Sequence, residues 1–339
     1  MNKEKENQEQ AGKAQGRGLM VFLCVLLALA LCLAVINLIP PRKVMEDNPF
    51  VKEKNALPMI AAHRGGGRSN PENTLMAFRA AVNEYDIQIC ETDLWMTADG
   101  HLVYSHDGSI NRMACPEGAE PVIIAEHTLA ELRKYNMGYN FADPVSGDYP
   151  YRELSDAEQE AMGLKILEFH ELLEEFYDSR KDLLFIVEIK NEGELGYAAA
   201  EIIDRTLTER FPDYKSNLVV GTFHPEIEVD LKRNHPSLLR GASTSGAAVF
   251  VFTQMLGVNL FSDTDFACLQ IPMSYTVKGI RLDLTRQSYI DRAHRKNIAV
   301  QFWTINDEDD MRYLIERGAD AIMTDDPQLL HRVLQDYRR

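Results

Sequence analysis

The chain has few cysteines, and none of them lies at the spacing of a metal site. The five are Cys24, Cys32, Cys90, Cys115 and Cys268, and no two form the closely spaced pairs of structural zinc sites. Two of them fall inside an apolar run, which leaves three for the rest of the chain. Three scattered cysteines are too few for a disulfide framework, and the redox compartment stays open.

Positive charge is also scarce. The 339 residues include 36 Lys and Arg against 52 Asp and Glu, a net charge of -16. A chain of this charge repels a polyphosphate backbone unless a local basic patch intervenes, so we expect no nucleic-acid partner. Its length and its 45% apolar content suffice for one large core, and a single barrel of about 250 residues would fit.

One long apolar run stands out, at residues 19–39 (LMVFLCVLLALALCLAVINLI), and it carries no charge. At about 1.5 Å per residue a helix of this length crosses a bilayer, so we predict a single transmembrane helix after a short polar tail, residues 1–18. A cleaved signal peptide is the alternative, but its apolar region is usually shorter. A lipoprotein signal needs a small residue before Cys32, where Leu31 stands. Four basic residues flank the run on each side, so charge does not choose an orientation.

Residues 40–57 open with two prolines and lack apolar periodicity, which predicts a linker and a globular domain from residue 58. From there, short β-branched runs alternate with amphipathic helical stretches, the pattern of βα units around a parallel sheet. The number of candidate strands suits a closed (β/α)8 barrel. They are residues 58–62, 87–93, 184–189, 218–222, 238–242, 267–271, 298–304 and 321–324.

Two further features interrupt this rhythm. Residues 101–105 predict an extra strand that returns from the second one through a turn at Ala98-Asp99-Gly100. A hairpin centred between Ala98 and Asp99 would place residue 91 opposite residue 106. Residues 140–163, rich in Asp, Pro, Gly and Tyr, predict a small insertion beside the mouth of the barrel.

The first chemical cluster follows the first candidate strand, where AHRGGG occupies residues 62–67 and NPENT residues 70–74. The carboxyl ends of barrel strands are where catalytic groups gather. His63 supplies a proton carrier, Arg64 a bidentate phosphate donor, and the glycines a backbone that a ligand can approach closely. A simple surface loop would have a similar composition.

The second cluster is Glu91-Thr92-Asp93, whose two carboxylates point to one side of a strand. Such a pair repels unless a cation lies between, and Mg²⁺ or Ca²⁺ prefers these oxygen ligands. His106, brought back by the hairpin, is then a candidate general acid. An isolated pair of this kind is more often an ordinary polar edge.

The third cluster is Glu188-Ile189-Lys190, again at a strand end. Alternation places Glu188 and Lys190 on one face, so that a carboxylate ligand and a cation for phosphate would emerge together. By itself the pair would also serve as an unremarkable salt bridge.

Taken together, these residues resemble the ordered motif set of glycerophosphodiester phosphodiesterases, over residues 58–335. The motifs that carry the resemblance are His63-Arg64-Gly65, Pro71-Glu72-Asn73-Thr74, Glu91-Thr92-Asp93, Thr97 with Asp99-Gly100, His106-Asp107, Glu188-Ile189-Lys190, Thr222-Phe223, Phe302-Trp303-Thr304-Ile305-Asn306 and Met323-Thr324-Asp325-Asp326-Pro327.

The resemblance implies a distorted TIM barrel that hydrolyses a small-molecule glycerophosphodiester to an alcohol and glycerol 3-phosphate. It implies one divalent cation, Ca²⁺ or Mg²⁺, as cofactor, and three groups of site residues. These are the catalytic pair His63 and His106, the substrate-binding residues Arg64, Lys190 and Trp303, and the metal ligands Glu91, Asp93 and Glu188. Anchored relatives also suggest a cytoplasmic tail with the barrel outside. Gly66-Gly67-Arg68 and residues 140–163 depart from the family pattern, which leaves substrate choice open.

Two alternatives remain at this point. Related barrels with a similar histidine pair act as lysophospholipase D-like or cyclising phosphodiesterases, and the membrane helix keeps lysophospholipids open as substrates. A non-catalytic phosphate-ligand receptor could keep the barrel without turnover, but it should have lost at least one chemical group, and all of those named above are present. The head group and the oligomeric state are not predicted.

Overall fold

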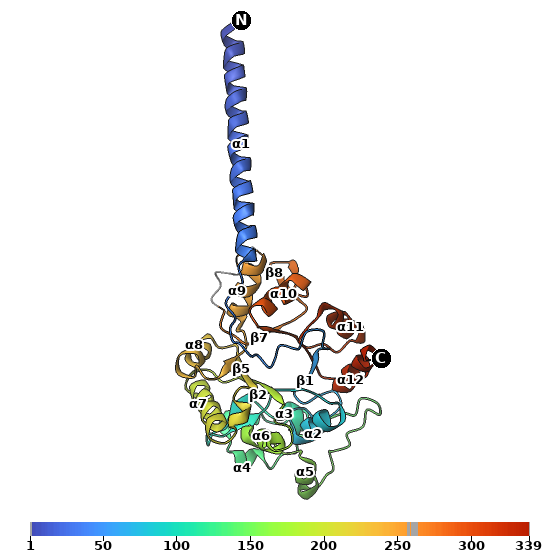
Figure 1. Ribbon diagram of the computed structural model, residues 1–339. Helices are drawn as coiled ribbons and strands as arrows, with labels where there is room; N and C mark the ends of the chain where they lie inside the picture. Colours follow the sequence, from blue (N-terminus) through green and yellow to red (C-terminus); the bar gives the residue numbers. More distant parts are fainter. Residues whose placement is uncertain (1, 256–257, 259–263, 339) are drawn as a thin grey trace. The chain divides into compact units, whose positions relative to one another are not determined.

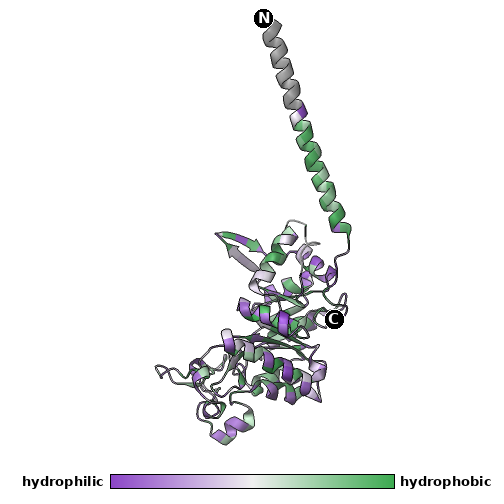
Figure 2. Cartoon of the chain, turned by 90° about the vertical axis from the view of Figure 1, so that its left-hand side faces the viewer, coloured by the Kyte–Doolittle hydropathy of each residue, from purple (hydrophilic) through white to green (hydrophobic). Residues whose placement is uncertain are grey.

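The computed structural model describes residues 2–255, 258 and 264–338, and it divides into two units, residues 1–42 with 249–263 and residues 43–248 with 264–339. The first unit contains α1 (Asn2–Leu38) (Figure 1). This helix includes both the apolar run and the polar residues before it, which the sequence pattern predicts to be a separate tail. Its segment Arg17–Leu38 is long and apolar enough to cross a membrane (Figure 2). Most of its large apolar side chains are exposed. A signal sequence near the N-terminus would share these properties.

The second unit is a nearly closed barrel of parallel strands in the order β6-β5-β4-β2-β1-β11-β10-β7. Between β6, which is two residues long, and β7 the described residues form one isolated bridge, Gly241–Cys268, which nearly closes the barrel. The predicted distorted (β/α)8 barrel is therefore confirmed. The strands are β1 (Met59–His63), β2 (Ile89–Met96), β4 (Leu184–Ile189), β5 (Leu218–Thr222), β6 (Leu239–Arg240), β7 (Cys268–Ile271), β10 (Ala299–Phe302) and β11 (Ala321–Thr324).

Helices alternate with these strands along the chain, and most of them have an apolar stripe at three- and four-residue spacing. In the last helix the stripe is Leu330, Val333 and Leu334. The helices are α2 (Leu75–Glu84), α6 (Phe169–Tyr177), α7 (Gly193–Glu209), α8 (Pro225–Asn234), α9 (Thr244–Met255), α10 (Gln287–Arg295), α11 (Glu308–Arg317) and α12 (Pro327–Tyr337), with a short 3-10 turn, η2 (Pro212–Tyr214), before β5.

Part of the segment expected to be a linker belongs to the barrel unit instead. Phe50 is fully buried in a cluster with inward-facing strand residues such as Ile89 and Leu184. The side chain of Asn48 donates to the carbonyl oxygen of Ala267 at 2.8 Å. The backbone N–H of Val44 donates to the carbonyl oxygen of Lys296 at 2.9 Å. One buried aromatic in an irregular segment leaves no periodic signal, so the sequence pattern missed this packing.

The hairpin of β2 and β3 (Leu102–Tyr104) forms as predicted, but its register differs by one residue. Leu94 pairs with Tyr104 and Met96 with Leu102, so the turn is centred on Asp99 and residue 91 does not oppose residue 106. Gly100 adopts a left-handed φ of 85°, which allows a three-residue loop where we expected a two-residue one.

Between β3 and β4 the chain forms a satellite core with short helices, α3 (Asn111–Ala114), η1 (Ile124–Glu126), α4 (Leu129–Leu132) and α5 (Asp156–Met162). Residues 140–163 contain α5 and an extended loop in which the Arg152 guanidinium lies 3.8 Å from the ring centroid of Tyr149. The side chain of Asn140 donates to the carbonyl oxygen of Cys115 at 2.6 Å, which joins this segment to the end of α3. Two further strands, β8 (Ser274–Val277) and β9 (Ile280–Asp283), form a separate hairpin after β7.

Candidate active site

Four of the predicted site residues lie on three neighbouring strands. His63 on β1 is in register with Glu91 on β2, and Asp93 on β2 is in register with Glu188 on β4. The carboxyl ends of parallel strands meet at one rim of a barrel. The strand pairing therefore gathers these four side chains at that rim, although their segments are far apart in sequence.

The loop after β1 needs the residues found there. Arg64 and Gly66 have left-handed φ values of 54° and 90°, and a Cβ on Gly66 would lie 2.7 Å from a side-chain carbon of Pro327. Asn73 holds the loop by donating its backbone N–H to the carbonyl oxygen of Arg64 at 2.8 Å. Thr74 accepts from the N–H of Ala77 and so caps α2. The NPENT motif is thus a support for the loop that carries Arg64.

His63 is held by an aspartate from the other end of the chain. Its Nδ1 lies 2.5 Å from Oδ1 of Asp325, and Oδ2 of Asp325 accepts from the Asn306 amide at 2.7 Å. Its Nε2 lies 3.9 Å from Oε2 of Glu91. Burial opposes protonation of the ring, but the Asp325 hydrogen bond and the charge of Glu91 outweigh it and raise the pKa of His63. The ring therefore presents only Nε2 for proton exchange.

His106 has the same arrangement with a neighbour in sequence. Its Nδ1 lies 2.8 Å from Oδ1 of Asp107, and Oδ2 of Asp107 accepts from Nε of Arg112 at 2.6 Å. Arg112 also donates to Glu72 at 2.6 Å, and Glu72 lies 3.4 Å from Arg64. This chain of ion pairs connects His106 to the predicted phosphate-binding arginine.

These supporting residues were given no role in the sequence analysis. Asp325 and Asp107 stand inside the motifs that carry the family resemblance, so that signal was available. Arg112 lies outside those motifs and is half exposed, and nothing in the sequence pattern distinguishes it from a surface arginine.

Two of the three predicted metal ligands, Asp93 and Glu188, share Lys190 as their ion-pair partner. Its Nζ lies 2.9 Å from Oδ1 of Asp93 and 2.8 Å from Oε1 of Glu188. The other oxygen of Asp93 is buried without a hydrogen-bond partner. This oxygen makes only a 3.6 Å ion pair with Nε of Arg64. Burial, and next to it the charge of Asp93, raise the pKa of Glu91 to about 7, although the positive charge of His63 lowers it. A buried carboxylate oxygen without a hydrogen bond and a destabilised buried carboxylate suit a hard divalent cation with oxygen ligands.

Among the described residues, a tighter cluster of ligand atoms occurs elsewhere. Glu192, His224 and Glu226, at the ends of β4 and β5, have one ligand atom each within 4.8 Å of the others. Both glutamates are exposed and the group lies at the start of α8. The predicted acids are not grouped at this distance; the Lys190 ammonium lies between Asp93 and Glu188.

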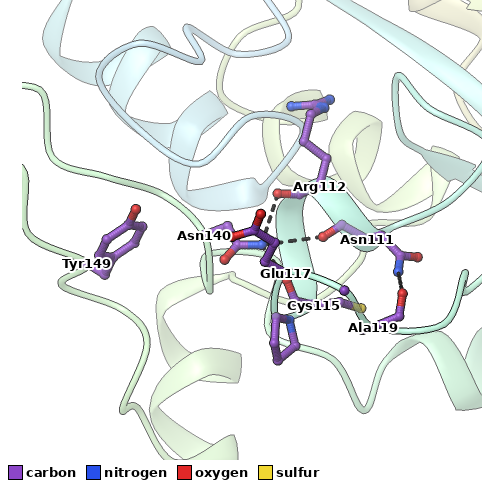
Figure 3. Close-up of a pocket in the computed structure, with 9 residues that line it drawn as sticks. Asn111, Arg112, Cys115, Glu117, Ala119, Asn140 and Tyr149 are labelled. Carbon is purple, nitrogen blue, oxygen red and sulfur yellow. Dashed lines mark hydrogen bonds between the residues drawn. The ribbon is translucent and has the colours of Figure 1, made fainter.

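Aromatic side chains and two cavities border the site. Trp303 follows β10 and is 37% exposed, and Phe223 follows β5 with its ring centroid 5.9 Å from Nζ of Lys190. One cavity of about 360 Å³ is lined by Gly67, Glu72 and residues 140–142, so the insertion forms a wall next to the loop after β1. A second of similar volume lies between Arg112 and Tyr149 (Figure 3).

Comparison with known proteins points to one family. The model of the glycerophosphoryl diester phosphodiesterase family matches residues 63–329. A glycerophosphodiester phosphodiesterase of Caldanaerobacter subterraneus is 26% identical over 80% of this chain and 96% of its own, and one of Bacillus subtilis is 24% identical over 82% and 87%.

Solved structures share the fold. A glycerophosphoryl diester phosphodiesterase domain from Mycobacterium tuberculosis superposes with a TM-score of 0.65 at 20% identity, over 84% of this chain and all of that one. An Oleispira antarctica phosphodiesterase, solved with its product sn-glycerol-3-phosphate, gives 0.59 at 22% identity over 82% and 97%.

Proposed function

This chain belongs to the glycerophosphoryl diester phosphodiesterase family, and on that premise we propose that it is a metal-dependent hydrolase that releases an alcohol and glycerol 3-phosphate. One observation carries the proposal. Two imidazoles, each held at Nδ1 by an aspartate, adjoin the carboxylates of β2 and β4. Nε2 of His63 lies 3.9 Å from Oε2 of Glu91, and His106 follows β3, which pairs with β2.

The side chains then divide the work as follows. Arg64 and Lys190 hold the phosphate oxygens and spread the charge that develops in the transition state. One imidazole takes a proton from the attacking water, and the other gives a proton to the departing alkoxide as the phosphorus–oxygen bond breaks. Because Asp325 and Asp107 bind the Nδ1 atoms, both exchanges take place at Nε2.

Glu91, Asp93 and Glu188 would hold the divalent cation. When bound, Ca²⁺ or Mg²⁺ supplies Lewis-acid stabilisation of the phosphoryl oxygens. The ligand role requires the Lys190 ammonium to leave at least one of its two carboxylates, and a phosphate oxygen is the natural new partner for it. Trp303 would form the wall against the glycerol or the head group.

Lysophospholipids are a second candidate substrate class, which α1 favours because a membrane tether brings the barrel to lipids. Assaying the full chain with glycerophosphocholine and with lysophosphatidylcholine separates the two. Hydrolysis of the former with release of glycerol 3-phosphate is expected. Turnover of lysophosphatidylcholine alone, or a cyclic phosphate product, would replace the primary proposal with a lysophospholipase D-like or cyclising activity.

The side of the membrane is part of the proposal. We place the barrel outside the cytoplasm, tethered by α1 as a single-pass anchor. Protease added to intact cells should then remove the barrel. Protection of the barrel until the cells are lysed would reverse the orientation.

Replacing Asp325 by Asn should lower kcat by roughly 10²–10³-fold, because an amide does not fix the ring tautomer of His63 as a carboxylate does. Asp325 raises the pKa of His63, so the limb of the pH–rate profile that belongs to His63 should move to lower pH. Asp326→Asn is the matched control. It removes the same charge one residue away, where the side chain caps α12 and Asn serves equally well. Equal rates in the two variants would contradict the role given to Asp325.

A further inference from the structure

We infer that the β8–β9 hairpin, the arm, is a membrane-contacting element that rests its apolar face on the surface of the bilayer. This inference rests on the proposed membrane anchor and phosphodiesterase function. It adds a second contact between the protein and the membrane, made by the arm. The arm projects from the barrel as a pair of strands (Figure 2). It is paired with none of the barrel strands, and an isolated two-stranded hairpin has little stability in water alone.

The strand register gives the arm two unlike faces. Tyr275 pairs with Leu282 and Val277 with Ile280, so four apolar side chains share one face. Ser274 pairs with Asp283 and Thr276 with Arg281, which makes the opposite face polar. Both faces are largely exposed, and exposure is unusual for the apolar one. Tyr275 and Ile280 are 56% and 67% exposed, whereas a sheet face of this composition is normally covered.

The charges of the arm favour a lipid surface as the partner of its apolar face. Its tip is the turn Lys278-Gly279, with left-handed φ values of 47° and 81°, and Arg281 lies beside it. Both cations are exposed, on a chain whose net charge is -16. An anionic bilayer repels such a protein overall but attracts a cationic tip with an apolar face, as it does interfacial segments.

The connection to α1 limits the distance between the barrel and a membrane. The arm itself lies near the proposed site. Five residues separate the end of the apolar helix, Leu38, from Val44, which is already bonded to the barrel. Even fully extended, such a tether reaches only about 20 Å, and this limits the distance between the bilayer and Lys296, just before the amino end of β10. At its base the arm follows β7, whose last residue, Ile271, accepts from the N–H of Trp303. A membrane contact here would bring lipid to the mouth of the barrel.

Tryptophan fluorescence tests the contact directly. The full chain is reconstituted in vesicles of phosphatidylcholine and phosphatidylglycerol that contain brominated lipid, which quenches tryptophan within the bilayer. Tyr275→Trp should add a strongly quenched signal to that of Trp95 and Trp303. Thr276→Trp, one residue on and on the polar face, should add a signal that is quenched less. Equal quenching of the two added signals would overturn the inference.

Activity gives the second measurement. Val277→Asp combined with Ile280→Asp should lower the rate on lysophosphatidylcholine held in the vesicles by at least about threefold and leave that on soluble glycerophosphocholine unchanged. Ser274→Asp with Thr276→Asp adds the same charge to the polar face and should change neither. If neither substrate is hydrolysed by the wild type, the proposed function fails while the quenching result still decides the contact. Loss of self-association on mutating the apolar face, without quenching, would assign the arm to a second copy of the chain instead.

Discussion

Replacing His63 or His106 by alanine should lower the rate of glycerophosphodiester hydrolysis by roughly 10²–10⁴-fold each, which is the usual contribution of a positioned proton carrier. Each ring is fixed at Nδ1 by an aspartate and so offers one nitrogen to the substrate. Neither histidine belongs to the apolar core. The variants should therefore fold, with a moderate loss of stability for His63→Ala because Asp325 and Glu91 lose a buried partner.

His101→Ala is the matched control for this pair. His101 lies on the same hairpin as His106, and its Nδ1 is 2.9 Å from Glu168, so it too is an imidazole paired with a carboxylate. It has no partner among the proposed site residues, and its removal should leave the rate within about twofold of the wild type. Initial rates and thermal unfolding curves should be measured for all three variants. Normal turnover by folded His63→Ala and His106→Ala proteins would refute the assignment.

The double variant, in which both His63 and His106 are alanine, should lose only slightly more activity than the less active single variant. If one imidazole accepts a proton and the other donates one in the same displacement, removing either already stops the coupled path. Multiplicative losses would instead indicate that the two rings act in separate steps.

The barrel and the rim residues could be predicted because their signals are local. Strand runs such as residues 184–189 and 218–222 are continuous and β-branched, and the structure has strands at those residues. Parallel strands place their carboxyl ends together whatever the connections between them. The polar residues that end three such runs therefore had to meet.

What could not be predicted depends on contacts between distant segments or on single residues. Asp325 reaches His63 across 262 residues, and only the folded barrel makes them neighbours. Phe50 is one aromatic residue without a periodic pattern around it. The hairpin register depends on whether Gly100 takes a left-handed φ, which shifts every pair by one residue. The arm did have a signal, because alternating apolar residues flank Lys278-Gly279, but it falls between β7 and α10, where a βα unit is expected to have only a loop.

Removing divalent cations with EDTA should abolish hydrolysis, and adding Ca²⁺ or Mg²⁺ should restore it. The cation should also stabilise the fold, by about 2.7 kcal/mol when its free concentration is 100 times Kd. Asp93→Asn should lose at least about 10²-fold in rate and most of the stabilisation by the cation, because Asp93 is the proposed ligand with a buried oxygen that makes no hydrogen bond. Full activity in EDTA would exclude the metal-dependent mechanism.

Glu91→Gln separates a ligand from a merely buried acid, because its effects on activity and on stability should have opposite signs. The pKa of Glu91 is raised from 4.5 to about 7. Between these values the folded state binds more protons than the unfolded chain, so the free energy of unfolding of metal-free protein falls as pH rises. Glu91→Gln should remove this fall, so that above pH 7 the metal-free variant unfolds at a higher temperature than the wild type while being inactive. Glu209→Gln, at an exposed carboxylate on α7, should change neither property. If the Glu91→Gln protein without metal is less stable than the wild type, then the neighbouring residues stabilise the Glu91 carboxylate. Such a result would contradict the view that this carboxylate destabilises the metal-free fold.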